Sequence, residues 1–309
     1  RRFWKIAAAA AVLLLAGSLY VWLNRPPAPQ PVKVALEKEP FDAPPGRSGA
    51  ILTLSNGEKV LLDSIGNGTV AMQGRTRLRK LGGQLNYKTV DAALPASAVF
   101  YNTMTVPRGR TFKLRLEDGT MVWLNAGSTI RFPTAFTGNE RKVEVTGEAY
   151  FEVTPRAGMP FTVQLNDAAI EVLGTSFDVA DYSDEKKMTT TLLKGAVKLR
   201  TGTQELVLTP GQEGNIEKQT GVLSAKEVDT DRAVAWTKGR LTIGNSDFAA
   251  LMRQISRWYD VDVVFAGKVP DVRIGGYIHR DVNLSVVLEY LGDNGVRYKT
   301  AGKTITILP

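Results

Sequence analysis

Few side chains in this sequence could take part in catalysis. Glu148 and Glu152 lie four residues apart and could form a pair of carboxylates for general acid–base chemistry. Side chains alternate along a strand, however, so both would point in the same direction, as they would in a solvent-facing pair. His279 is the only histidine, so a Ser-His-Asp triad would have one candidate base, and a lone histidine is usually structural. We therefore expect no enzymatic activity from these residues.

The residue inventory also excludes most metal and thiol chemistry. The 309-residue sequence contains no cysteine, which removes disulfides, thiolate metal sites and cysteine nucleophiles. A single histidine cannot form a multi-histidine zinc site. With 43% hydrophobic residues, the chain can bury ordinary cores and form more than one domain. The sequence therefore predicts a folded protein without a metal site or a cofactor.

A net charge of +8 and the basic stretch from Arg75 to Lys80 raise the question of nucleic-acid binding. The arginines in this stretch alternate with other residues, which places Arg75, Arg77 and Arg79 on one face of an extended segment. Such a row fits the solvated face or the charged edge of a sheet. No aromatic stacking motif or recognition helix accompanies it. We expect no direct contact with nucleic acid.

An uncharged apolar segment extends from Ile6 to Leu23. As a helix that rises ~1.5 Å per residue, it would span about 27 Å, close to the hydrocarbon thickness of a bilayer. Arg1, Arg2 and Lys5 precede it, and such basic flanks stay in the cytoplasm. We predict that residues 1–25 hold a single transmembrane helix in the inner membrane. The residues expected to anchor it are Ile6, Leu14, Leu15, Tyr20, Trp22 and Leu23.

The rest of the chain would then lie in the periplasm. Residues 26–49 are rich in proline, which predicts a stiff, extended linker. The alternative is a cleaved signal peptide that uses the small residues Ala16-Gly17-Ser18, but the apolar run continues to Leu23. The sequence opens with Arg1 rather than methionine, so we expect a cytoplasmic part upstream of it.

The middle of the chain has the pattern of short strands separated by turns. A thirteen-residue pattern occurs twice, at Ile51–Asp63 and at Lys113–Asn125. In each copy, alternating leucines precede an Asn-Gly or Asp-Gly pair, which predicts a hairpin with a tight primed turn. The two hairpins are expected to stack or pair with each other. Further strands are predicted at 141–146, 149–154, 161–164, 168–173, 176–180, 188–193, 196–200 and 205–208.

A series of short motifs in this region resembles the FecR domain, in the longer family form common in the Bacteroidetes. The resemblance covers roughly 106–217, and each motif also has a purely structural reading as a turn, a core residue or a strand end. The motifs are Val106-Pro107-Arg108-Gly109, Leu116-Glu117-Asp118-Gly119-Thr120, Val122-Trp123-Leu124-Asn125-Ala126-Gly127-Ser128, Gly147-Glu148-Ala149-Tyr150-Phe151-Glu152-Val153, Val172-Leu173-Gly174-Thr175-Ser176-Phe177 and Leu208-Thr209-Pro210-Gly211-Gln212.

After Trp236 the pattern changes to strand–helix–strand, twice over. Phe248, Leu251, Met252, Ile255 and Tyr259 share one helical stripe, which Ser246 or Asn245 could cap. A second helix begins at Asn283 with Leu284, Val287, Leu288 and Leu291 on its stripe, and Gly292 could supply its left-handed end. Strands at 241–243, 261–265, 272–278, 296–299 and 304–307 would complete a small helix-covered α+β unit.

This C-terminal unit is similar to the last module of FecR-like proteins, which resembles the short STN fold of secretins and TonB-dependent receptors. The likeness rests on Trp258-Tyr259-Asp260-Val261 and Gly239-Arg240-Leu241. An edge strand of such a small sheet could accept a strand from a partner. Trp236, Trp258 and Tyr259 are candidate partner-binding residues, with core packing as the alternative.

The sequence thus predicts a mainly β protein with one N-terminal transmembrane helix. Residues 50–105 would form a β-rich extension, and 106–222 the all-β FecR domain, built as a twisted sandwich or a short solenoid-like stack of hairpins. Residues 236–309 would form the STN-like α+β domain.

The resemblance implies a function in signalling. It identifies the chain as an anti-sigma factor whose C-terminal domain meets the signalling domain of an outer-membrane TonB-dependent transporter. The cytoplasmic part would hold an extracytoplasmic-function (ECF) sigma factor, and intramembrane and periplasmic proteases would release it. The resemblance also points to self-cleavage at Gly174-Thr175, with Thr175 as the internal nucleophile of an N-to-O acyl shift. The Gly-Thr dipeptide itself recurs in this sequence, at 68–69, 119–120 and 202–203.

Two other classes of protein remain open. A β scaffold with exposed arginines could bind acidic glycans in the periplasm, as an enzyme or as a binding protein, although the residue inventory disfavours an enzyme. A membrane-anchored adaptor would bind partners without changing sigma-factor activity.

Overall fold

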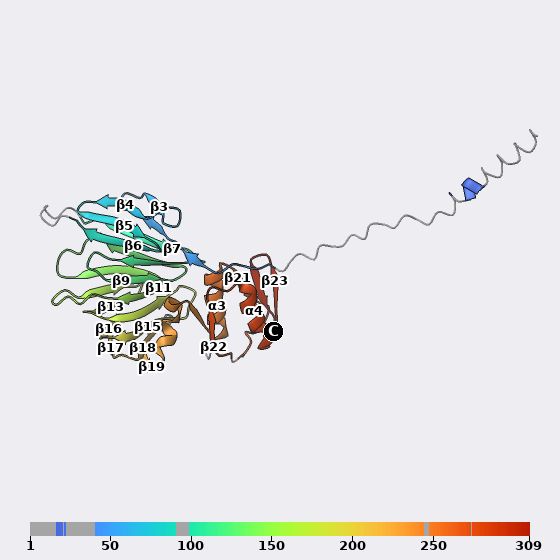
Figure 1. The fold of residues 1–309 in the computed structure, drawn as a ribbon. Coiled ribbons are helices and arrows are strands. Elements are labelled where there is room, and N and C mark those ends of the chain that lie inside the picture. Colours follow the sequence, from blue (N-terminus) through green and yellow to red (C-terminus); the bar gives the residue numbers. More distant parts are fainter. Residues whose placement is uncertain (1–16, 21, 23–40, 91–98, 244–246, 273) are drawn as a thin grey trace, which may run out of the picture. The chain divides into compact units, whose positions relative to one another are not determined.

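The computed structural model describes residues 17–20, 22, 41–90, 99–243, 247–272 and 274–309 (Figure 1). The chain divides into two units, 1–39 and 40–309. In the first unit, residues 17–20 and 22 are helical, with Tyr20 and Trp22 exposed. Ile6, Leu14, Leu15 and Leu23 lie outside the described residues. None of the helices in the described part is both long and apolar enough to cross a membrane.

The second unit begins with a module of strands that form two sheets, here called the β module. The first sheet contains, in spatial order, β3 (Lys59–Leu61), β2 (Ile51–Thr53), β7 (Tyr101–Val106), β10 (Ser128–Pro133), β11 (Arg141–Glu152), β12 (Phe161–Gln164), β13 (Ala168–Val172), β16 (Val197–Thr201) and β17 (Gln204–Leu208). The second contains β4 (Gly68–Gln73), β5 (Thr76–Leu81), β6 (Gln84–Thr89), β8 (Arg110–Arg115), β9 (Met121–Leu124), β11, β14 (Ser176–Asp181), β15 (Lys187–Lys194), β18 (Gln212–Glu217) and β19 (Leu223–Glu227). The two-residue strand β1 (Arg47–Ser48) runs parallel to β8.

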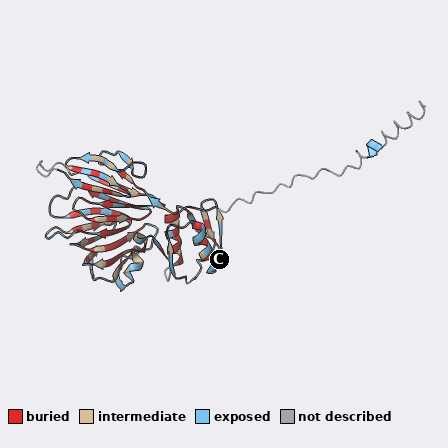
Figure 2. Ribbon diagram, viewed as in Figure 1, coloured by how far each residue is buried: buried red, intermediate tan, exposed pale blue. Residues whose placement is uncertain are grey.

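One apolar core is shared by the two sheets. Residues alternate between buried and exposed along most strands, so each sheet contributes one face (Figure 2). Phe151 and Phe177 stack with their ring centroids 5.1 Å apart, and Phe161 lies 5.9 Å from Phe151. Burial of these side chains, each worth roughly 1.5–3 kcal/mol, stabilises the module. The prediction that this region is all-β is therefore confirmed.

The hairpins also follow the order expected of a stack. The hairpin of β12 and β13 lies in the first sheet, that of β14 and β15 in the second, and the next two alternate in the same way. The hairpin of β16 and β17 pairs with that of β12 and β13 through β13–β16, and the hairpin of β18 and β19 pairs with that of β14 and β15 through β15–β18. The sandwich is thus extended by stacking hairpins on alternate faces of one core, and it combines both predicted architectures. The strands of the predicted extension, 50–105, belong to the same two sheets, and the last strand ends at Glu227.

The sequence prediction of two strands at 141–146 and 149–154 is wrong, because β11 is one continuous strand. Its first part pairs with β10 and β12 in the first sheet, and its second part with β9 and β14 in the second. The change of sheet occurs at Gly147, which has φ of +83°. A Cβ atom there would lie 2.6 Å from Ser128 Oγ, so both the backbone angle and the close approach require glycine.

Both copies of the repeated pattern are hairpins, as predicted, but they neither pair with each other nor have primed turns. They lie in opposite sheets, as β2–β3 and β8–β9, and contribute to the same core. Only the glycines, Gly57 and Gly119, have positive φ. The residue before each one stays at negative φ and accepts a backbone hydrogen bond with its side chain, Asn56 from Glu58 and Asp118 from Thr120.

The basic stretch behaves as the alternation predicts. On β5, Thr76 and Leu78 are buried and Arg77 and Arg79 are exposed. The strand lies between β4 and β6, so its arginines line the solvated face of a sheet and not its edge.

A C-terminal module with its own apolar core follows two short helices. These are α2 (Thr230–Ala233) and the 3₁₀ helix η1 (Ala235–Lys238), and the module contains β20 (Arg240–Ile243), α3 (Phe248–Tyr259), β21 (Asp262–Phe265), β22 (Gly276–His279), α4 (Leu284–Asp293), β23 (Tyr298–Ala301) and β24 (Thr304–Ile307). The predicted strand–helix–strand order is correct. The strands form two small sheets, β20–β22 and β21–β24–β23, instead of the single sheet predicted. The buried stripes of α3 and α4 meet in one core (Figure 2).

The helix ends differ from the prediction. Asp247, and not Ser246 or Asn245, caps α3 by accepting a hydrogen bond from the Ala249 backbone. The left-handed residue after α4 is Gly295, with φ of +86°, and not Gly292. Residues of the same capping chemistry lie within three positions of each other at both ends, so spacing alone could not distinguish these alternatives.

Candidate functional site

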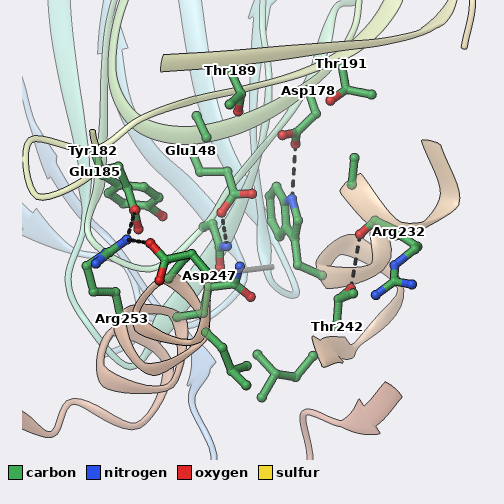
Figure 3. A pocket seen from close by; sticks show the side chains of 18 of the residues that line it. Glu148, Asp178, Tyr182, Glu185, Thr189, Thr191, Arg232, Thr242, Asp247 and Arg253 are labelled. Carbon is green, nitrogen blue, oxygen red and sulfur yellow. Dashed lines mark hydrogen bonds and ion pairs between the residues drawn. The ribbon is translucent and has the colours of Figure 1, made fainter. Parts of the chain in front are cut away.

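The β module and the C-terminal module meet along α3, and several charged side chains are buried at this junction. A cavity of about 830 Å³ opens there, lined by side chains from both modules (Figure 3). The labelled residues in Figure 3 include Glu148, Asp178 and Glu185 from the β module and Asp247 and Arg253 from the C-terminal module.

An acidic loop between β14 and β15 binds two arginines of α3. The Arg257 guanidinium contacts Asp184 at 2.9 Å and Glu185 at 2.7 Å, and Arg253 reaches the other Glu185 oxygen at 2.5 Å. The Arg257 guanidinium also lies 3.9 Å from the centroid of the Tyr182 ring, a cation–π geometry. Burial opposes ionisation of Glu185, but the hydrogen bonds from both arginines hold its pKa below the ordinary value.

A second connection runs through Arg280, which is only 6% exposed. Its Nη2 donates to Asn125 Oδ1 at 3.0 Å, and the Asn125 amide donates to the Glu148 carboxylate at 2.5 Å. Its guanidinium packs 3.8 Å from the centroid of the Trp258 ring, whose Nε1 donates to the Arg280 carbonyl at 2.9 Å. Burial lowers the pKa of Arg280 to about 10, so the side chain remains charged at neutral pH.

Two carboxyl groups in the cavity have the opposite electrostatic environment. Asp178 is 4% exposed and accepts a hydrogen bond from Trp236 Nε1 at 3.1 Å. Burial raises the pKa of Asp178 well above its ordinary value, and the negative charge of Glu148 raises it further. Burial also raises the pKa of Glu148, although the Asn125 hydrogen bond and the charges of Arg257 and Arg280 oppose this change. In the folded protein, both carboxyl groups therefore keep their protons to higher pH than ordinary carboxyl groups do.

A third connection is the turn between β7 and β8. The Arg108 guanidinium donates to the Ser256 carbonyl at 3.0 Å and to the Ser256 hydroxyl at 2.8 Å, and it also contacts the Val261 carbonyl. The Gly109 backbone N–H donates to the Arg257 carbonyl at 2.8 Å. Asp260, at φ of +52°, ends α3 in the left-handed conformation and lies 3.5 Å from Arg108. The turn therefore binds the carbonyl end of α3, where cations are stabilising.

Comparisons with known proteins agree with this two-module arrangement. The sequence model of the FecR protein family matches residues 102–198, and that of the FecR C-terminal domain matches 240–307. A crystal structure of a candidate anti-sigma factor from Parabacteroides distasonis is 30% identical, with a TM-score of 0.63. The match covers 67% of this chain and 98% of that one. The chain belongs to the FecR family.

A second crystal structure of a candidate anti-sigma factor from Parabacteroides distasonis is also 30% identical to this FecR-family chain, with a TM-score of 0.61. That match covers 66% of this chain and 97% of the other chain. A search of curated proteins found no match. The expectation of a FecR-family protein is confirmed, and the two family regions lie within the β module and the C-terminal module, respectively.

In this FecR-family protein, three of the motifs that carry the family resemblance build the junction. The motif around Arg108 binds the end of α3, and those around Asn125 and Glu148 hold Arg280. The interpretation of Glu148 and Glu152 as a solvent-facing pair is wrong for Glu148, which lines the cavity, while Glu152 is exposed. The strand pattern could not reveal this, because the covering module begins only at β20, far along the sequence.

The three predicted partner-binding residues lie close to the junction but differ in exposure. Trp236 is half-buried and lines the cavity beside Asp178. Trp258 and Tyr259 are 6% and 5% exposed and belong to the core of the C-terminal module, and the Tyr259 hydroxyl donates to the Val282 carbonyl at 2.9 Å. Sequence reasoning missed Arg253 and Arg257, although their spacing of four on one helix and the acidic pair Asp184-Glu185 offered a signal.

The candidate cleavage bond, Gly174-Thr175, lies in the β module, away from the residues that line the cavity. Thr175 is 3% exposed, and its hydroxyl donates to the Ala196 carbonyl at 3.0 Å. A Cβ atom on Gly174 would lie 2.7 Å from the Pro155 ring, so close packing is sufficient to require glycine at this position. Self-cleavage stays a prediction.

Proposed function

We propose that this protein is a membrane-anchored anti-sigma regulator that relays a signal from an outer-membrane TonB-dependent transporter to a cytoplasmic ECF sigma factor. Membership of the FecR family supports a regulatory role, and the similar Parabacteroides proteins are described as candidate anti-sigma factors. The observation that carries the proposal is the junction, in which two separately cored modules are joined mainly by charged and hydrogen-bonded groups.

Such a junction is suited to reversible opening. The β module and the C-terminal module each have a complete apolar core, so separating them leaves both folded. Hydrogen bonds across the junction can be exchanged for bonds to water at a net cost of about 0.5–1.5 kcal/mol each. Interfaces of this polar kind within a chain permit relative motion of the domains.

The proposed anchor is the uncharged segment from Ile6 to Leu23, with its basic flank in the cytoplasm. In this arrangement both modules are periplasmic, and the signal crosses the membrane through one helix. A single helix transmits a small rotation poorly. Regulated cleavage by periplasmic and intramembrane proteases is the simpler route by which the cytoplasmic part would release the sigma factor.

The proposed docking surface for the transporter signalling domain is the edge of β22. Among the described residues β22 pairs only with β20, and its Tyr277 side chain is 45% exposed. An unpaired edge can accept an extended strand from a partner, and an exposed aromatic side chain adds contact area. A partner bound at β22 would contact the C-terminal module, which also supplies Arg253 and Arg257 to the junction.

The experiment is capture of the full chain, in detergent, by an immobilised transporter signalling domain. We expect Tyr277→Lys to weaken capture by at least ten-fold, whereas Tyr101→Lys, on an equally exposed tyrosine of the β module, should leave it unchanged. Equal capture of both variants would reject β22 as the docking edge. Retention of the chain on polysaccharide, with no capture by any signalling domain, would support the glycan-binding alternative.

A further inference from the structure

The residues that precede the β module are held against both modules. Residues 41–48, here called the strap, begin at the C-terminal module with Phe41 packed against its core and Ala43 buried in it. The strap ends as β1, where Arg47 N–H donates to the Gly109 carbonyl at 3.0 Å. The segment that connects the modules to the proposed membrane anchor is therefore bound to the junction itself.

Asp42 attaches the strap to α4. Asn283 occupies the cap position of this helix but makes no capping hydrogen bond with its side chain. The Asp42 carboxylate supplies that bond by accepting from the Ser285 backbone N–H at 2.8 Å, and it also accepts from the Ser285 hydroxyl and the Asn283 amide, both at 2.9 Å. The Leu284 N–H donates to the Ala43 carbonyl at 2.9 Å. Two backbone donors at the start of α4 are thus satisfied from the strap.

Gly46 brings the strap into contact with Trp258. A Cβ atom on Gly46 would lie 2.6 Å from the Trp258 ring, so only glycine permits this approach. The same ring packs on Arg280, which connects to Asn125 and through it to Glu148. The strap therefore touches one end of the hydrogen-bonded connection that joins the two modules.

Gly109 provides a second link between strap and junction. Its carbonyl accepts from Arg47 of the strap, and its N–H donates to the carbonyl of Arg257, the residue that binds Asp184 and Glu185. Displacement of α3 from the β module would break the bond between Gly109 and Arg257 and remove Trp258 from beneath Gly46. Loss of the Trp258 contact removes a partner of the strap directly, and loss of the Arg257 bond frees the Gly109 turn that holds the β1 end of the strap.

We propose that the strap is a releasable lock: residues 41–48 are protected from proteolysis while the junction is closed and become accessible when the junction opens. This inference rests on the proposed function for its role in the cell, because it supplies the step between docking and cleavage. The coupling between release of the strap and opening of the junction does not depend on any partner.

The test is limited trypsin digestion of the full chain in detergent, followed by intact mass. Cleavage after Lys38 leaves the strap on the product, whereas cleavage after Arg47 requires the strap to leave β8 and gives a product that begins at Ser48. When cleavage is slower than closing, its rate follows the population of the open form. The ratio of these two products therefore measures strap release.

We expect Asp42→Ala and Gly46→Val to produce the Ser48 fragment about ten-fold faster than the unmodified chain, because each removes or blocks a contact that closes the strap. Asp293→Ala, at an exposed acid near the end of α4, should not change the rate. Synthetic peptides of residues 40–51 with the same substitutions control for direct effects on trypsin. A stable 48–309 fragment confirms that the modules remain folded.

Arg257→Gln tests the coupling, since its side chain does not touch the strap. We expect a rise in the Ser48 fragment of several-fold, with Arg77→Gln as the matched control on an exposed arginine of β5. Unchanged rates in Asp42→Ala and Gly46→Val would overturn the lock. An increase in those variants but none in Arg257→Gln would overturn the coupling. These digestions contain no sigma factor or transporter, so their failure is distinguishable from failure of the proposed function.

Discussion

At the scale of single residues, the junction contains two kinds of carboxyl group. Asp184 and Glu185 form ion pairs with an arginine of α3, and the arginine hydrogen bonds hold the pKa of Glu185 below its ordinary value. Asp178 is buried, accepts a hydrogen bond from Trp236 and has Glu148 as a charged neighbour, so burial and the Glu148 charge raise its pKa. The raised pKa of Asp178 and the lowered pKa of Glu185 therefore make the stability of the fold depend on pH in opposite directions.

The raised pKa of Asp178 gives a signed pH dependence. Because the pKa is higher in the folded than in the unfolded state, the folded protein binds more protons, and the free energy of unfolding falls as pH rises from the unfolded value through the folded one. Asp178→Asn removes the charge and keeps an acceptor for Trp236. We expect this variant to be more stable than the unmodified chain at neutral pH, by about 1 kcal/mol, and similar to it in acid.

Thermal unfolding between acidic and neutral pH measures this effect. Asp293→Asn, an exposed acid on α4, serves as the control and should leave the pH profile unchanged. Parallel profiles for the unmodified chain and Asp178→Asn would contradict the assignment of a raised pKa to Asp178.

Thr175 also makes a prediction at this scale. If the Gly174-Thr175 bond cleaves itself, Thr175→Ala abolishes processing, whereas Thr175→Ser retains a hydroxyl nucleophile and continues to cleave. Thr175→Ala also leaves the Ala196 carbonyl without its donor, at a cost of about 1 kcal/mol. Gel analysis of the processed fragments separates the two effects. Processing that continues unchanged in Thr175→Ala would remove self-cleavage from the account.

At the scale of elements, the long strand β11 joins the two sheets and carries Glu148 to the junction. Its first half pairs in one sheet and its second half in the other, so the position of Glu148 depends on the change of direction at Gly147. Gly147→Ala would need a positive φ and would place a Cβ atom 2.6 Å from Ser128 Oγ.

We expect Gly147→Ala to lower the free energy of unfolding by about 3 kcal/mol, through backbone strain and overpacking together. Gly138→Ala is a matched control, because Gly138 also has positive φ but nothing lies within 4 Å of the added Cβ. Its cost should be about 1 kcal/mol, from strain alone. Denaturant unfolding measures both, and equal costs would show that the contact with Ser128 is unimportant.

Elements with a regular period could be predicted from the sequence, and those that depend on distant partners could not. The stripes of α3 and α4 and the alternation of β5 identify their buried faces directly. The sequence of β11 contains a glycine that is equally typical of a turn, so its continuity was missed. The cap of α4 comes from Asp42, more than two hundred residues away, and no local pattern indicates it.

The candidate site could be predicted only in part, because its residues also depend on partners that are distant in the sequence. Trp236 was predicted from its type, but Arg257 and Asp184 are separated by 73 residues and become partners only in the fold. The motifs around Arg108, Asn125 and Glu148 could be recognised but not interpreted, because Arg108 and Asn125 contact the C-terminal module and Glu148 is linked to it through Asn125. Local sequence determines the strands that present these side chains, whereas the partners depend on how the two modules meet.

At the scale of the whole molecule, the junction between the two modules would control the regulatory output in the proposed function. Two complete cores are joined by ion pairs and hydrogen bonds, and the strap connects that junction to the chain leading towards the proposed anchor. Opening therefore does not require either module to unfold. The ion pairs of Arg253 and Arg257 are the contacts whose loss most directly favours the open form.

The most direct measurement is sigma-factor activity from a transcriptional reporter in cells that lack inducer. The double variant Arg253→Ala, Arg257→Ala should give activity near the induced level, at unchanged protein abundance, because the junction opens without a docked transporter. The matched double variant Arg77→Ala, Arg79→Ala, which removes two exposed arginines from β5, should remain inducible. Activity of the Arg253→Ala, Arg257→Ala variant at the uninduced level, with normal abundance, would contradict control by the junction.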